Sequence, residues 1–330
     1  MARGSPDWHG LPAPVRFPPP PPPPSPHPPR PPMPGSALPP LPALFAGTTI
    51  FLLGAILGSF LNVVIRRIPA GESVVRPGSR CRCGEPLPWH DNLPLVSWLL
   101  LRGRARCCGA RISPRYPLVE GITALLFLLC WWLHPPAVAL SLAVLVLFLV
   151  PAFWIDLDHL VIPDLFTVGG MLLGLALSFL VPGLHGFPEA AAPSLRGLGS
   201  AFLGVLLGSS VYYWLAVGAG LALRREALGE GDIKLAGCLG AFLGWQGAVF
   251  ALFGGAVLGT AILLPVLAWQ RFRAGRAGRA EPDRGERLGA GSEIPFGPFL
   301  IAAALAYALG LDGPVDAWFS ALGRALALLS

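Results

Sequence analysis

Charged residues are scarce in this chain. Only 13% of its 330 residues are Asp, Glu, Lys or Arg, whereas 54% are hydrophobic. A soluble globule of this size needs more polar side chains to cover its surface. The composition therefore excludes a soluble globular protein and indicates a protein of the membrane, with the lipid bilayer as its surroundings.

Several familiar sequence signals are also missing. The chain contains no Gly-x-Ser-x-Gly elbow and no His-Glu-x-x-His motif, so it carries no visible machinery for serine or zinc proteolysis. Its N-terminus lacks the basic-then-apolar order of a secretory signal. Residues 1–42 are instead dominated by proline, including the run from Pro18 to Pro24. They predict a Pro-rich, disordered tail without a catalytic role.

Long apolar runs recur after this tail. Most approach the roughly 20 residues that a bilayer core requires, and they lie at 43–65, 117–134, 137–155, 160–181, 197–223, 234–270 and 298–310. The run at 234–270 is interrupted at Gly244, Trp245 and Gln246, which predicts a short helix followed by a full one. We therefore expect an all-α polytopic membrane protein with about eight transmembrane helices, or seven if the interrupted run counts once. A loop subdomain at 66–116 follows the first helix at 43–65, and a transmembrane domain occupies 117–330.

Basic residues are concentrated in two segments. Ten of the 24 Lys and Arg residues lie between Arg66 and Arg115, and six lie between Arg271 and Arg287. The positive-inside rule places both segments in the cytoplasm. Alternating the spans then puts residues 156–159 and 224–234 at the cytoplasmic face, and both termini and residues 182–196 outside. This topology accounts for the basic excess, so we expect no nucleic-acid partner.

Acidic residues gather at the ends of apolar runs. A charge at the centre of a spanning helix costs about 2.5–3.5 kcal/mol, so acids near spans are candidates for function. One cluster, at 154–164, holds Asp156, Asp158 and Asp164, and a second, at 229–234, holds Glu230 and Asp232. Both reach the cytoplasmic face, so they can meet. Two carboxylates held together near apolar surroundings do not both ionise readily, which is the arrangement of aspartic proteases.

The residues alone do not select one acid of the first cluster. On a helix, Asp156 and Asp158 point about 200° apart, and Asp164 lies roughly 12 Å further along the axis. Interfacial solvation or capping of the next helix is the alternative for Asp158 and Asp164. In the second cluster, Gly229 and Gly231 permit close approach beside Asp232, although an ordinary helix-end turn would use the same glycines.

Six blocks of the sequence carry a further signal: 58–69, 89–99, 113–120, 155–158, 229–235 (Gly-Glu-Gly-Asp-Ile-Lys-Leu) and 294–298. Their residues and their order resemble the prepilin (type IV leader) peptidases, which belong with the intramembrane GxGD aspartic proteases. The resemblance covers roughly residues 45–310. It implies that Asp156 and Asp232 are the catalytic pair and that 117–330 is a transmembrane aspartic peptidase domain.

The resemblance also implies a substrate and a location. Members of the family cleave the basic leader of pilin or pseudopilin precursors, after a Gly and on the cytoplasmic side of the bacterial inner membrane. Proteolysis by two aspartates needs no cofactor. Many members also N-methylate the new amino terminus with S-adenosylmethionine.

Four cysteines, Cys81, Cys83, Cys107 and Cys108, fall in the predicted cytoplasmic loop, where thiols stay reduced. In the family this loop resembles a pair of Cys-x2-Cys zinc knuckles. Here the first pair is one residue short, and Ala105 stands where a third cysteine would fall. The alternatives are a zinc site built from all four thiols, or a metal-free loop held by packing of Trp89, Trp98 and Tyr116 against the membrane-facing helices. This difference from the family's cysteine spacing makes the prediction of N-methylation weaker than the prediction of proteolysis.

Other polar residues have simpler interpretations. His90 and His159 are expected to be solvated imidazoles at the interface, and Cys130 and Cys238 to be core residues. Two competing functions remain. A proton or cation transporter would place its acids near mid-span, and a non-catalytic assembly factor of a pilus or secretion system would not need both aspartates.

Overall fold

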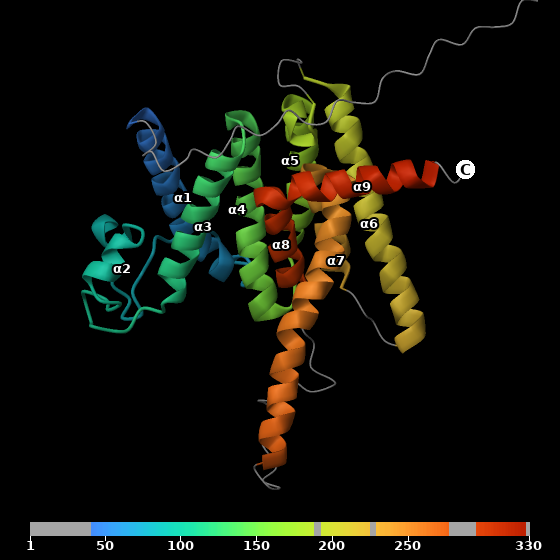
Figure 1. The fold of residues 1–330 in the computed structure, drawn as a ribbon. Helices are drawn as coiled ribbons and strands as arrows, with labels where there is room; N and C mark the ends of the chain where they lie inside the picture. Colours follow the sequence, from blue (N-terminus) through green and yellow to red (C-terminus); the bar gives the residue numbers. More distant parts are fainter. Residues whose placement is uncertain (1–40, 188–192, 225–228, 277–294, 328–330) are drawn as a thin grey trace, which may run out of the picture. The chain divides into compact units, whose positions relative to one another are not determined.

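The computed structural model describes residues 41–187, 193–224, 229–276 and 295–327 (Figure 1). The predicted Pro-rich tail lies outside the described residues apart from its last two positions, and so does most of the basic segment from Arg271 to Arg287. Across the described ranges the chain forms helices joined by loops, with two isolated β-bridges and no strand. The prediction of an all-α protein is confirmed.

The apolar runs form helices because backbone N–H and C=O groups within a bilayer must be satisfied inside their own segment. Six helical stretches are long and apolar enough to cross a membrane, and α5, with 17 residues, is a shorter apolar helix. The protein is therefore polytopic, as predicted. The helices of these stretches are α1 (Leu41–Arg67), α3 (Arg115–Leu133), α4 (Pro136–His159), α5 (Asp164–Leu180), α6 (Leu195–Leu223), α7 (Glu230–Arg276), and α8 (Gly297–Ala306) with α9 (Asp312–Ala327).

The long helix α7 is broken at Gly244, whose φ of 71° and ψ of 178° are not helical. A positive φ is readily adopted only by glycine, so the break falls at the residue that tolerates it. The predicted interruption of this run is confirmed, and the two parts of α7 correspond to the predicted short and full helices.

The last described helix, α9, was not predicted. After α8, the π-helical turn η3 (Tyr307–Leu311) contains Gly310 at a φ of 153°, and α9 begins directly after it. The Tyr307 hydroxyl donates a hydrogen bond of 2.7 Å to Asp316 of α9. The last apolar run was expected to end at 310, because the mixed polar and apolar residues beyond it do not read as a membrane span.

Helices α6 and α7 form a close antiparallel pair lined by small residues. A Cβ atom added at Gly204 of α6 would collide with the backbone carbonyl of Gly240 in α7, and the reverse substitution would collide with Gly204. Small residues let helix backbones approach in a membrane, where association depends on van der Waals packing. This pairing holds the N-terminal end of α7, with its acidic cluster, against α6.

The loop between α1 and α3 contains the short helices η1 (Trp89–Asn92) and α2 (Val96–Leu100). The Trp98 indole donates to the Ile112 carbonyl at 3.3 Å, within the loop itself. The Leu95 backbone N–H donates to the Glu120 carboxylate of α3 at 2.7 Å. Trp89 is 78% exposed and Tyr116 41% exposed. These polar contacts anchor the loop. Trp89 does not pack against the membrane helices as the metal-free alternative expects, whereas Trp98 is half-buried.

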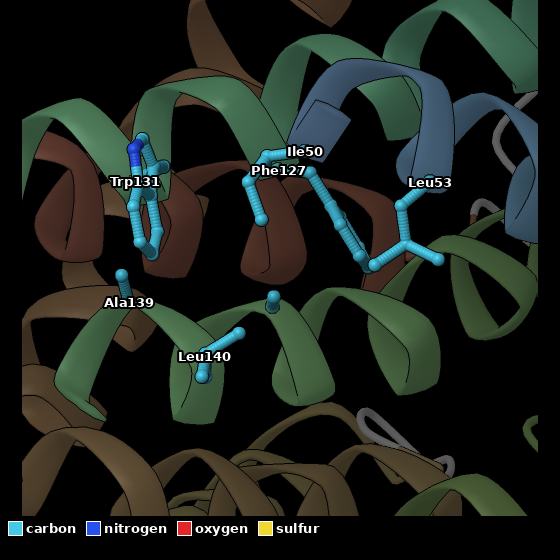
Figure 2. A pocket seen from close by; sticks show the side chains of 7 residues that line it. Ile50, Leu53, Phe127, Trp131, Ala139 and Leu140 are labelled. Atoms are coloured by element: carbon cyan, nitrogen blue, oxygen red, sulfur yellow. The ribbon is translucent and has the colours of Figure 1, made fainter. Parts of the chain in front are cut away.

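A small apolar pocket lies between α1, α3 and α4 (Figure 2). Its lining comes from the first half of α4, including Ala139 and Leu140, and from the last half of α3, including Phe127 and Trp131. The acids of α4 lie in its last turn, so this pocket belongs to the opposite end of that helix and is not the site of the acids.

Candidate active site and cysteine cluster

Asp156 lies in the last turn of α4 and is buried, with 6% of its surface exposed. The helix ends at His159 because Leu160 adopts a left-handed conformation, with its N–H bonded to the Asp156 carbonyl at 2.9 Å. The side-chain oxygen Oδ2 of Asp156 has no hydrogen-bond partner among the described residues. A buried carboxylate oxygen without a protein partner is costly unless another group, such as water or a substrate, occupies the site.

Asp232 lies in the first turn of α7 and is 8% exposed. Its backbone N–H bonds to the Gly229 carbonyl at 3.1 Å, which forms the turn that starts the helix. Gly231 packs against Ile162 of the α4–α5 connection, where an added Cβ would lie 3.4 Å from the Ile162 Cβ. The Ile162 side chain also lies next to Gly297, where an added Cβ would collide with Oδ2 of Asp156. The structure thus brings together the two acidic clusters, which are far apart in the sequence.

The other two aspartates of the first cluster form ion pairs. Asp158 accepts from the Arg115 guanidinium at 2.6 Å, and that guanidinium stacks over the Trp154 ring at 4.5 Å. Asp164 pairs with Lys234 of α7 at 2.8 Å. Pro163, not Asp164, is the N-cap of α5. Of the three candidate acids, only Asp156 is buried and without a cation.

Gly297, the first residue of α8, packs directly on Asp156. A Cβ atom added there would collide with Oδ2 of Asp156 and lie 3.0 Å from Ile162. This glycine belongs to the block 294–298, whose sequence predicts no particular role for it. Its contact depends on where α8 begins relative to α4, which no local pattern specifies.

The remaining predicted residues occupy ordinary positions. His90 is 3.8 Å from the neighbouring Asp91, with a half-exposed side chain, and His159 is exposed. Cys130 and Cys238 are buried at 2% and 0% exposure, as predicted for core residues. The acids lie at helix ends rather than at mid-span, which is not the arrangement expected of a transporter.

The four loop cysteines converge. Their sulfur atoms all lie within 4.8 Å of one another, with Cys81 and Cys108 at 3.5 Å and Cys83 and Cys107 at 3.4 Å. Four thiolates around a zinc ion at about 2.3 Å would lie about 3.8 Å apart, so the set fits a tetrahedral site. If a metal were bound, the adjacent Cys107 and Cys108 would supply two ligands, although Ala105 stands where a third knuckle cysteine would fall.

The pKa values of two of these thiols are shifted in opposite directions. The Cys83 backbone and the Cys107 and Cys108 side chains lower the pKa of Cys81 to about 7. Hydrogen bonding with Cys81 and Cys83, together with burial, raises the pKa of Cys107 to about 12. Such a set would lose protons on binding a metal cation, because thiolates are the ligands.

Comparisons with known proteins agree with this architecture. Two family models match, the Bacterial Peptidase A24 N-terminal domain at residues 52–134 and the Type IV leader peptidase family at residues 143–264. No solved structure matches the chain. The first match covers α3 and most of α1, and the second covers the segment that holds both Asp156 and Asp232.

The names of the curated relatives all refer to the processing of prepilin or prepilin-like leader peptides. The chain is 44% identical over 250 residues to the "Prepilin leader peptidase/N-methyltransferase" of Myxococcus xanthus, covering 73% of this chain and 68% of the relative. It is 42% identical over 211 residues to the "Type 4 prepilin-like proteins leader peptide-processing enzyme" of Escherichia coli, covering 58% and 74%. A "Prepilin leader peptidase/N-methyltransferase" of Dickeya chrysanthemi is 36% identical over 291 residues, covering 79% and 90%.

Proposed function

The chain belongs to the type IV leader peptidase family and is a membrane peptidase that processes prepilins, and from this premise we propose that Asp156 and Asp232 are its catalytic pair. The observation that carries the proposal is that the acidic residues differ in burial and in ion pairing. Asp156 and Asp232 are buried and interact with each other, whereas Asp158 and Asp164 are paired with Arg115 and Lys234.

Such a pair can hydrolyse a peptide bond without a cofactor. When one carboxylate is ionised and the other holds a proton, the ionised group takes a proton from water as its oxygen attacks the carbonyl carbon. The protonated group gives its proton to the carbonyl oxygen. Collapse of the tetrahedral intermediate then breaks the C–N bond: the nitrogen accepts the proton that the first carboxylate took from water, and the oxygen returns its proton to the second carboxylate as the carbonyl re-forms. The backbone of Gly297 leaves the Asp156 oxygen free of a neighbouring side chain.

The substrates are type IV prepilin or pseudopilin precursors, cut at the cytoplasmic face of a bacterial inner membrane. Two features support this location. The segment from Arg66 to Arg115, which includes the loop between α1 and α3, carries ten Lys and Arg residues, the bias expected of a cytoplasmic segment. Arg115, the first residue of α3 after that loop, pairs with Asp158 beside the acids, which supports the same face for them.

The test is co-expression with a precursor, followed by a gel shift and N-terminal mass measurement. Asp156→Asn and Asp232→Asn are expected to abolish leader removal while leaving membrane insertion intact. Asp158→Asn and Asp164→Asn are the matched controls and should retain most of the processing. Unchanged processing by both members of the first pair would refute the assignment.

The cysteine cluster is proposed to hold zinc through Cys81, Cys83, Cys107 and Cys108. The close sulfur spacing supports this, because it removes the objection raised by the altered Cys-x2-Cys pattern. Zinc would supply a structural crosslink and no step of the hydrolysis. We further propose that the chain retains N-methylation with S-adenosylmethionine as methyl donor, and the N-terminal mass of the product tests this directly.

A further inference from the structure

The register of α6 against α7 places one side chain of α6 opposite Asp232. The helices are antiparallel, and Gly204 meets Gly240 while Gly208 meets Ala236, where an added Cβ on Gly208 would lie 2.8 Å from the Ala236 carbonyl oxygen. Each step of four residues along α6 thus corresponds to a step of four back along α7. One step further, just over one helical turn, brings position 212 opposite position 232.

Position 212 is a tyrosine, and its side chain is wholly buried. Tyr212 has 0% exposure, and its hydroxyl has no hydrogen-bond partner among the described residues. The charge of Asp232 acts on this hydroxyl, as the helix register predicts. A buried tyrosine hydroxyl usually finds a partner, because leaving it unpaired costs about 1–3 kcal/mol. The unpaired hydroxyl therefore indicates that its partner belongs to the working site.

We propose that Tyr212 is a positioning residue of the active site, whose hydroxyl donates a hydrogen bond to the Asp232 carboxylate, directly or through one water. This inference rests on the proposed role of Asp232. The hydroxyl favours the ionised form of Asp232 and orients it toward Asp156, because a donor stabilises the charged form of a carboxylate. It would thereby help to decide which member of the pair takes the proton from water.

Among the residues that the structure describes, the other charged groups near Asp232 do not supply such a donor. Asp156 from α4 is itself an acid, and Lys234 is paired with Asp164 at 2.8 Å. Glu230 of the same helix turn is exposed and acidic. From α6, Tyr212 brings an uncharged donor that can bond to Asp232 without forming an ion pair.

Tyr212→Phe removes only the hydroxyl, and Tyr213→Phe is the matched control, since Tyr213 is the next residue and 51% exposed. With the full-length protein in micelles and a prepilin substrate, we expect Tyr212→Phe to lower kcat about tenfold with little change in KM. The acid limb of the pH–rate profile should move to higher pH by about one unit, because the ionised carboxylate loses a donor. Tyr213→Phe should match the wild type.

A measurement of thermal stability distinguishes the proposed positioning role of Tyr212 from a purely structural role. Removing one hydroxyl, and with it one hydrogen bond, should lower the thermal midpoint of Tyr212→Phe by no more than about 4 °C, so a protein still folded at the assay temperature would show that lower activity does not reflect unfolding. Wild-type kcat and pH profile in Tyr212→Phe, or an equal loss in Tyr213→Phe, would overturn this inference alone, provided Asp232→Asn is inactive. Full activity of Asp232→Asn in the same assay would instead refute the proposed function.

Discussion

At the scale of single residues, one short segment holds three aspartates in three different environments. Asp158 and Asp164 each have a cation at hydrogen-bond distance, and both are exposed enough for water to stabilise their charges. Asp156 has neither. Burial of a carboxylate without a cation costs free energy of folding, so its presence in the Asp156 environment indicates a chemical function. Environment, rather than residue type, distinguishes the candidate catalytic acid.

Gly297 offers a prediction at this scale. Gly297→Ala would place a methyl group against Oδ2 of Asp156 and should reduce leader cleavage at least tenfold, because a displacement of about 1 Å at a catalytic group costs about a hundredfold. Cleavage of a precursor by purified protein measures the effect. Gly313→Ala, where an added Cβ meets no atom within 4 Å, is the control. Normal cleavage by Gly297→Ala would show that this contact does not shape the site.

At the scale of secondary-structure elements, the α6–α7 pair depends on glycines at particular positions. Gly204 and Gly240 meet backbone to backbone, whereas Gly218 of the same α6 helix has open space where a Cβ would be. Both kinds of glycine look alike in a sequence that contains 41 of them. The packing separates the interfacial glycines from the others.

Substitution by alanine should separate these two classes. Gly204→Ala is expected to destabilise the protein by about 1–3 kcal/mol, because overpacking forces the helices apart. Gly218→Ala should be neutral or slightly stabilising, since Ala is a better helix former than Gly. Thermal unfolding midpoints in detergent compare the two. A midpoint for Gly204→Ala at or above that of Gly218→Ala would contradict the close approach.

The elements themselves were largely predictable from the sequence. Apolar runs near bilayer length gave the helices, and Gly244 with its neighbours gave the break in α7, because both signals are local. The meeting of the two acidic clusters was predicted from charge bias and alternation of spans, whereas the choice of Asp156 within the first cluster came from the family resemblance. The contact of Gly297 with Asp156 and the position of Tyr212 were not predictable, since they depend on the register between helices. The amphipathic α9 was missed because it is too polar to read as a span.

At the scale of the whole molecule, the cysteine loop and the peptidase helices form separate stretches of the sequence joined by few polar contacts. The Leu95 backbone N–H donates to Glu120 of α3, and Arg67 of α1 donates to the Ser73 and Pro77 carbonyls of the loop. If the cysteines hold zinc, the metal would organise the loop and these contacts would hold the loop to the helices.

Metal content tests the loop. The purified protein should contain about one zinc per chain, and Cys81→Ser with Cys108→Ser should remove it, because two thiolate ligands are lost. Cys130→Ala, in the buried core, is the control and should keep the metal. Elemental analysis gives the count. Zinc retained by the double variant would exclude these four thiols as its ligands.

Membrane topology gives a second prediction at this scale. In a background with the four loop cysteines replaced by serine, Glu85→Cys should react with a membrane-impermeant maleimide only after the cells are opened. Arg196→Cys should react in intact cells, because its segment is expected outside. Both positions are exposed. Labelling of Glu85→Cys in intact cells would reverse the orientation.

The ion pair between Arg115 and Asp158 has a consequence for protein engineering. It joins a residue within the first family match, 52–134, to a residue within the second, 143–264. A chimera that exchanges these two parts between relatives would cut the chain in the α3–α4 connection and could still break this pair. The two parent proteins should therefore carry residues of opposite charge at positions 115 and 158. A hybrid that lacks this pair would be repaired by restoring arginine at position 115.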